Sequence, residues 1–254
     1  MITNLIIETI LNRKSIRRFK DDTLSDELIL SIVRAGQQAP FATQAYSLLL
    51  SRNQDKNPFK APLLFTICVD LHKLDLVSRS RGWSVATNDL ALLLFVTQDA
   101  CLMAENMVIA AESLGLGSCF LGGTFYSVEK IINDYKLPKR VFPILELVMG
   151  YPAENPIPRP RYPTKFVLFE NQYPELQGIV DDAITKMDNG YSAQNYYQVE
   201  DIGMIPLSNR EETFTPDTYV WSEHISRKWG QWHPSSKDVF GPLEKCGFHI
   251  IELD

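Results

Sequence analysis

DACLMAENMVIAAESLGLGSCFLGG, residues 99–123, combines a long apolar segment, a pair of glycines and a short second apolar run. Its scattered polar residues Gln98, Glu105 and Glu112 recur every seven positions, which predicts a helix from about Thr97 to Leu114 with one narrow polar stripe. Most of such a helix is buried, either at the centre of a domain or in an interface between subunits. Gly115 and Gly117 end the helix. The following residues, Ser118–Leu121, are predicted to form a short strand.

The GLGSCF motif in this stretch has some similarity to a dinucleotide-binding fingerprint. It lacks the third glycine, and it leads from a helix into a strand. A pyrophosphate cradle needs the opposite order, a strand that leads into the N-terminus of a helix. The motif is therefore interpreted as a helix cap and a tight turn.

The sequence on either side alternates between helix and strand patterns without a regular βαβ repeat. The N-terminal residues have helical spacing, and a second helix follows Ser25, a good N-cap, and ends before Pro40. Further helices are predicted after Ser127 and in the last third of the chain. Apolar runs predict three more strands, Ser47–Arg52, Leu63–Asp70 and Val141–Met149. These patterns predict an α+β fold.

Composition excludes several classes of protein. The chain has 254 residues, of which 45% are hydrophobic and 22% are charged, and its net charge is −6. An acidic chain of this kind is not expected to bind nucleic acid or an anionic membrane. Its four cysteines form no CxxC pair, so we expect reduced structural thiols and no metal site. In a secretory signal the charged residues precede the apolar stretch, whereas here they follow it, so we expect a cytoplasmic location.

A local basic cluster, RKSIRRF at residues 13–19, stands out in this acidic chain. On an extended backbone Arg13, Ser15 and Arg17 project to one side. Two guanidiniums and a hydroxyl can grip a phosphate because arginine offers forked donors to anionic oxygens. Arg159 and Arg161 repeat the spacing in a proline-rich connector. The two pairs predict a bound phosphate monoester; the alternative is that they are solvated basic faces.

Four blocks of sequence carry a family resemblance. They are RKSIRRF (13–19), QQAPFATQAY (37–46), the stretch 99–123 and LVMGYPAENPIPRPRYP (147–163). With these blocks in this order, the chain resembles the FMN-dependent oxidoreductases of the nitroreductase family. The resemblance implies a central, mostly antiparallel sheet flanked by helices, in an interlocked homodimer. It also implies an FMN-binding core over residues 1–165 and a C-terminal extension of the same domain over residues 166–254.

The resemblance also implies which residues bind the cofactor. Arg13, Ser15 and Arg17 are expected to hold the FMN phosphate and ribityl chain, and Arg159 and Arg161 to reach the same phosphate. The loop after the second helix is expected to lie against the isoalloxazine of the partner subunit, and two glycines to approach the ring closely. Those residues are Pro40, Phe41, Ala42, Thr43, Gln44, Gly122 and Gly123. The family usually has Ser, Asn and Gln where this chain has Phe41, Gln44 and Tyr46, so ring contacts and substrate choice are expected to differ.

The implied reaction is ping-pong hydride transfer, from NADH or NADPH to bound FMN and then to a nitroaromatic or quinone-type acceptor. The cofactor carries this chemistry, so no catalytic side chain is expected. The alternatives are another reaction on the same scaffold, such as dehalogenation or free-flavin reduction, and non-enzymatic flavin storage or sensing. A third possibility is an interaction protein that binds no cofactor.

The last third of the chain is less regular. A helix is predicted to end at Asn189-Gly190, and another to open at Thr215-Pro216 and to end at Gly230. Phe248–Leu253 is a candidate terminal strand. This region is interpreted as an arm that wraps the partner, as a lid over the flavin, or as ordinary packing elements.

Overall fold

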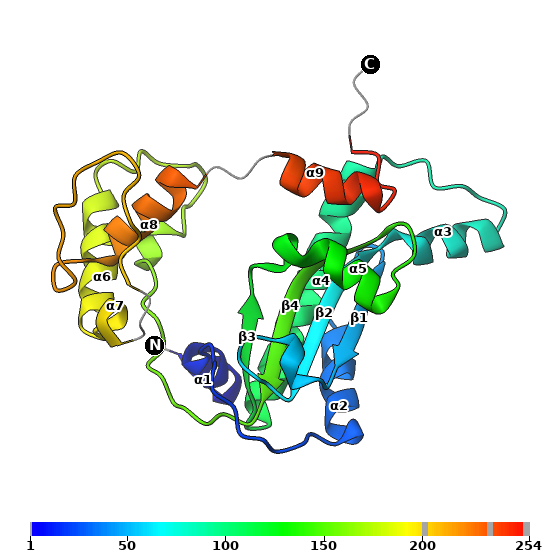
Figure 1. Cartoon of the computed structure of the whole chain (residues 1–254), viewed down its shortest axis with the longest axis horizontal. Coiled ribbons are helices and arrows are strands. Elements are labelled where there is room, and N and C mark those ends of the chain that lie inside the picture. Colours follow the sequence, from blue (N-terminus) through cyan, green and yellow to red (C-terminus); the bar gives the residue numbers. More distant parts are fainter. Residues whose placement is uncertain (1, 200–202, 233–235, 251–254) are drawn as a thin grey trace. The chain divides into compact units, whose positions relative to one another are not determined.

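The computed structural model describes residues 2–199, 203–232 and 236–250 (Figure 1). The chain divides into two compact units. The first unit comprises residues 1–156 and 235–254, and the second comprises residues 157–234. The boundary expected between residues 165 and 166 remains a prediction.

The elements of each unit follow the order of the chain. Those of the first unit are α1 (Leu5–Asn12), α2 (Asp26–Gln37), β1 (Tyr46–Ser51), a 3-10 helix (Gln54–Lys56), β2 (Leu63–Asp70), α3 (Leu71–Ser80), α4 (Asp89–Ser113), β3 (Gly117–Leu121), a 3-10 helix (Thr124–Ser127), α5 (Val128–Tyr135), β4 (Val141–Gly150) and α9 (Ser236–Lys245). Those of the second unit are a 3-10 helix (Thr164–Phe166), α6 (Val180–Ser192), α7 (Tyr196–Val199) and α8 (Trp221–Gln231).

One sheet of four strands lies at the centre of the first unit, in the order β1-β2-β4-β3. Each neighbouring pair is antiparallel, with Leu48 opposite Ile67, Phe65 opposite Leu147, and Cys119 opposite Val148. All four strands were predicted to within a residue or two. The α+β prediction and the antiparallel sheet are confirmed.

Helix α4 lies along one face of this sheet and contacts three of its strands (Figure 1). It begins well before the predicted Thr97, because the Asn88 side chain accepts a hydrogen bond from the amide of Ala91 and caps the helix there. Its C-terminus is as predicted: Gly115 has a φ of +78°, and the amide of Leu116 bonds back to Ala111 at 2.9 Å. The helix centre is the core of the unit, with Val96, Met103, Met107 and Val108 fully buried.

The opposite face of α4 corrects the expectation that most of the helix is buried. Its exposed side chains fall on one stripe and include Leu90, Leu94, Phe95 and Leu102. Among the described residues α4 is the one helix long and apolar enough to cross a membrane, with 44% of its most apolar window buried inside the structure. A core helix that packs against a sheet has the same apolar composition as a helix that crosses a membrane.

Helix α1 adds to this exposed apolar surface. It contacts α4, yet none of its residues is buried, and its apolar side chains Leu5, Ile6, Ile10 and Leu11 are all exposed. An amphipathic helix with an uncovered apolar face is typical of an interface.

Two predicted helix boundaries in the second unit are wrong. Helix α6 continues past Asn189-Gly190 to Ser192. A Cβ at Gly190 would lie 2.6 Å from Pro160, so this glycine serves close packing and not a helix end. Thr215-Pro216 opens a turn, in which the Thr218 hydroxyl accepts from the Thr215 amide at 2.8 Å, and α8 begins only at Trp221. Gly230 lies inside α8.

The C-terminal segment packs on the first unit's own core. Phe248 is fully buried against Phe142, with ring centroids 6.1 Å apart. The predicted strand Phe248–Leu253 is wrong where the structure describes it, at residues 248–250, and residues 251–253 lie outside the described part. The reason is that the amide of His249 bonds to the carboxylate of Asp89 at 2.8 Å and not to a neighbouring strand.

Candidate functional site

The predicted phosphate grip lies beside the first residues of β3. Its backbone is extended, Ser15 forms a parallel bridge with Ser118, and the amide of Ile16 donates to the carbonyl of Ser118 at 2.8 Å. Burial raises the pKa of the Cys119 thiol, and Arg17, Ser15 and Arg13 lie near enough to oppose that shift. Arg13, Ser15 and Arg17 thus all lie in the neighbourhood of the Cys119 thiol, and we call these three residues the basic cradle.

A glycine allows the cradle to lie so close to the sheet. A Cβ at Gly117 would lie 2.4 Å from Cγ1 of Ile16 and 2.9 Å from its Cβ, which no packed structure tolerates. Ile16 is 2% exposed, so its side chain has no room to turn away. The sequence analysis assigned Gly117 only to the helix end, because the contact joins segments far apart in the chain.

Glu154 fixes the cradle backbone from the other side. Its carboxylate accepts hydrogen bonds from the amides of Arg17 and Arg18, the latter at 3.1 Å, and forms an ion pair with the Arg18 side chain at 3.4 Å. Sequence analysis did not single out Glu154.

Two carboxylates on α4 lie near the first cradle residue. Glu105 is 4.0 Å from Arg13, whose side chain is mostly buried. Burial raises the pKa of Glu112, against the opposing effect of the nearby Arg13 and Lys14 charges. Within the described part of the chain, one oxygen of Glu112 is buried without a hydrogen-bond partner. The same holds for the hydroxyl of Ser118, directly beside the cradle.

The loop predicted to face the flavin ring, residues 40–44, is tied to α4 by a single side chain. The carboxylate of Asp99 accepts hydrogen bonds from the amides of Ala42, Thr43 and Gln44 and from the hydroxyl of Thr43. The side chain of Phe41, in contrast, is 57% exposed. Asp99 opens the quoted stretch 99–123, where no role was predicted for it. A carboxylate on the buried face of an apolar helix indicates that the carboxylate has a fixed hydrogen-bonding partner, and this was the signal present in the sequence.

The glycines Gly122 and Gly123 follow β3 and are both exposed. A Cβ at either position would have no heavy atom within 4 Å. The backbone here thus faces open space, as a close approach by a planar group requires.

Arg159 and Arg161 belong to the second unit and have partners within it. Arg159 donates to the side chain of Gln194 at 2.9 Å, and its guanidinium lies 3.8 Å from the centroid of the Tyr196 ring. Arg161 donates to the carbonyls of Arg159 and Pro160. Their expected role at the phosphate remains a prediction.

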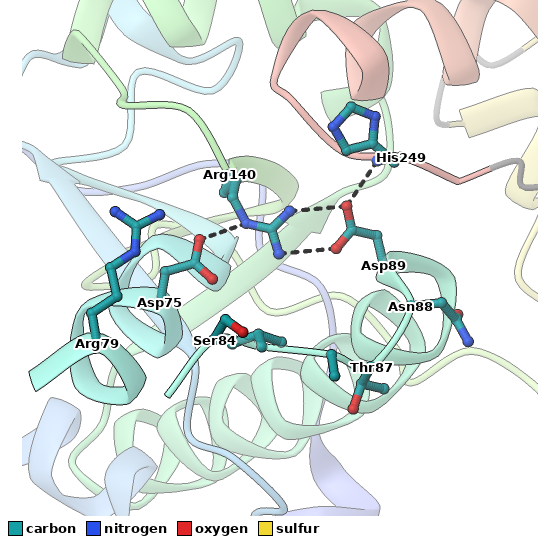
Figure 2. Close-up of a pocket in the computed structure, with 10 residues that line it drawn as sticks. Asp75, Arg79, Ser84, Thr87, Asn88, Asp89, Arg140 and His249 are labelled. Carbon is teal, nitrogen blue, oxygen red and sulfur yellow. Dashed lines mark hydrogen bonds and ion pairs between the residues drawn. The ribbon is translucent and has the colours of Figure 1, made fainter. Parts of the chain in front are cut away.

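A separate pocket of about 390 Å³ lies in the first unit, between the ends of α3 and α4 and the C-terminal segment (Figure 2). Arg140 is held there by a double hydrogen bond to Asp89, both at 2.9 Å, and by an ion pair with Asp75 at 2.7 Å. Burial alone lowers the pKa of Arg140, but the two carboxylates outweigh it and raise the pKa. The positive charge of Arg140 is thus balanced by the carboxylates of Asp75 and Asp89. The cluster joins α3, α4 and the segment of His249, and we interpret it as structural and not as a catalytic site.

The described residues form an α+β protein with one antiparallel sheet, and the basic cradle lies beside β3. The sequence profile described as "Nitroreductase family" matches residues 10–52 and 50–151, more than half of the chain. The chain belongs to the nitroreductase family, and the resemblance seen in its sequence is confirmed.

Individual relatives match along most of their length. An FMN reductase (NADPH) of Bacillus subtilis (strain 168) is 31% identical over 240 residues, which cover 87% of this chain and 90% of the relative. An oxygen-insensitive NADPH nitroreductase of Salmonella typhimurium is 28% identical over 236 residues, covering 87% and 89%. The solved structure of B. megaterium NfrA2 has a TM-score of 0.84 and 25% identity, and the match covers 98% of this chain and 100% of that one.

Proposed function

We propose that this protein is an FMN-dependent NAD(P)H oxidoreductase that reduces small-molecule acceptors of the nitroaromatic or quinone type. Its family, and relatives named as an FMN reductase and an NADPH nitroreductase, support this activity over flavin storage or sensing. The observation that carries the assignment is the basic cradle.

The donors present fit the phosphate of FMN. Arg13 and Arg17 supply forked cationic donors and Ser15 supplies a hydroxyl, the set that a phosphate dianion prefers. Among the described residues, the hydroxyl of Ser118, the residue bridged to Ser15, is buried without a hydrogen-bond partner. When bound, FMN supplies the hydride chemistry, and the cradle holds the cofactor by the end that does not react.

The remaining contacts are proposed on the geometry of the two loops. In this proposal the loop of residues 40–44 borders the isoalloxazine ring with its side chains. The glycines 122 and 123 border the ring with their open backbone. Phe41 presents an aromatic wall on which a flat acceptor can stack. Arg159 and Arg161 are proposed as further phosphate ligands.

We also propose that the protein acts as a homodimer, with residues 166–254 as an extension of the flavin-binding domain. The exposed apolar faces of α1 and α4 belong to one unit and adjoin each other, and a second copy of the chain would cover them.

The test is a titration of the apoprotein with FMN and with riboflavin, which lacks the phosphate, followed by anaerobic NADH or NADPH. Hydrogen bonds to charged groups contribute about 1.5–3 kcal/mol each, so Arg13→Gln and Arg17→Gln should each weaken FMN binding by about 10- to 150-fold. Riboflavin binding should change little. Arg34→Gln is the matched control, since this exposed arginine lies on α2 and outside the cradle. Equal losses for FMN and riboflavin would contradict the phosphate assignment, and flavin that NAD(P)H does not bleach would contradict the activity.

A further inference from the structure

Asp99 lies on the buried face of α4 and is only 3% exposed. Its partners all come from one loop. The amide of Ala42 donates to one carboxylate oxygen at 2.8 Å. The amides of Thr43 and Gln44 donate to the other oxygen, each at 2.9 Å, and the Thr43 hydroxyl joins them at 3.2 Å.

These bonds keep the carboxylate ionised in a buried position. Burial alone raises the pKa of Asp99, but the amides of Thr43, Ala42 and Gln44 outweigh it, and the pKa lies below its ordinary value. The bonds also hold an unfavourable backbone, because Gln44 has a φ of +53°, in the left-handed region that side chains other than glycine rarely occupy. A loop held in a strained conformation by a buried anchor points to a functional constraint.

The direction of the amides decides what the loop presents to the outside. Three successive N–H groups point inward to Asp99, so the loop does not offer them to a ligand. The groups left facing outward are side chains, those of the exposed Phe41 and Gln44.

We propose that Asp99 is a positioning residue for acceptor selection: it fixes the loop so that Phe41 stands as a rigid aromatic wall. The inference rests on the proposed function, because it assumes that this wall borders the flavin. Asp99 touches neither cofactor nor acceptor and acts only through residues 41–44.

The experiment compares two electron acceptors on the FMN-loaded enzyme. In a ping-pong reaction, kcat/KM for the acceptor reports the second half-reaction alone. Menadione is flat and stacks on an aromatic wall, whereas ferricyanide takes electrons without stacking. Aromatic contacts of this kind correspond to about 2- to 12-fold in kcat/KM, so Asp99→Asn should lower the menadione-to-ferricyanide ratio by that factor. A merely structural role lowers both values together and leaves the ratio unchanged.

Two further variants make the test specific. Phe41→Ala should lower the ratio as Asp99→Asn does, and the double variant should lower it no further, because both remove the same wall. Asp70→Asn is the matched control: this carboxylate is also buried and caps α3 by accepting from the Lys73 amide at 3.1 Å, and its loss should leave the ratio unchanged.

If Asp99→Asn does not fold, Thr43→Val replaces it, since it removes one of the four donors and keeps the shape of the side chain. A smaller fall in the same ratio is then expected. An unchanged ratio, or additive effects of Asp99→Asn and Phe41→Ala, would overturn the proposal. Failure of the wild-type protein to bind or reduce FMN would instead overturn the proposed function, so the two failures are distinguishable.

Discussion

Gly117→Ala is expected to disable flavin binding through a single added methyl group. The new Cβ would lie 2.4 Å from Cγ1 of Ile16, well inside the contact distance of two carbon atoms. Neither partner can yield easily. Gly117 is paired with Gly150 in the sheet, and Ile16 is buried and held by its amide to Ser118. The segment that carries Ser15 and Arg17 must therefore move away from β3.

The structure sets the size of the effect. Overpacking a filled site costs about 1–3 kcal/mol, which should appear as a lower free energy of unfolding. Moving the cradle also loosens its charge-assisted bonds to the phosphate. Loss of one such bond, about 1.5–3 kcal/mol, raises the Kd for FMN by about 10- to 150-fold.

The assay is an FMN titration of the apoprotein followed by quenching of flavin fluorescence, with urea unfolding measured in parallel. Gly178→Ala is the control, because a Cβ there meets no atom within 4 Å. Ile16→Ala in the Gly117→Ala background removes the closest clashing carbon and should restore part of the affinity. If Gly117→Ala binds FMN within about twofold of the wild type, the close approach does not position the cradle and the reasoning is wrong.

Three other outcomes are expected. Arg140→Met should lower the free energy of unfolding by about 3 kcal/mol because it leaves the buried carboxylate of Asp89 and the half-buried carboxylate of Asp75 without their cation. Arg79→Met, at an exposed arginine in the same pocket (Figure 2), should cost under about 0.5 kcal/mol; equal urea midpoints for the two would contradict this. Leu94→Glu, on the exposed face of α4, should convert the dimer to monomer in light scattering, and an unchanged mass would remove α4 from the interface. The lowered pKa of Asp99 means that its contribution to stability is present above its unfolded pKa of about 3.9 and is lost as the pH falls through the lower folded value. The difference in unfolding free energy between wild type and Asp99→Asn should therefore be constant from about pH 7 to 5 and shrink below about pH 4; a difference that stays constant as the pH falls from about 5 to 3 would contradict the ionised anchor.

The elements were predictable where local chemistry decides them. Ser25 caps α2 as expected, and its hydroxyl accepts from the amide of Leu28 at 3.2 Å. The run Leu63–Asp70 is β2 without a shift at either end, since a continuous apolar segment bounded by polar residues has few other ways to bury itself. The prediction of the cradle rests on a similar local rule, because alternate side chains of an extended segment share one side, and its role at a phosphate stays a prediction.

The errors occur where a residue serves a distant partner. Gly190 has the local pattern of a helix end, yet its role is to make room for Pro160, thirty positions back in the sequence. Gly117 shows the same effect, because it makes room for Ile16, which belongs to a separate segment of the chain. A single sequence shows that a glycine is present but not which neighbour approaches it, so close contacts of this kind are visible only in the folded chain.

Helix α4 links the proposed flavin site to the proposed dimer interface. Its buried face sends Asp99 to the loop of Phe41, and its partly exposed polar stripe sends Glu105 and Glu112 toward Arg13 of the cradle. Its exposed face is the apolar surface that we assign to a second copy. Because a helix is rigid, a shift of its exposed face also displaces the side chains on its other face. Substitutions in the exposed stripe should therefore alter FMN affinity as well as subunit mass, and a monomeric Leu94→Glu variant that binds FMN as tightly as the wild type would show that the two faces are independent.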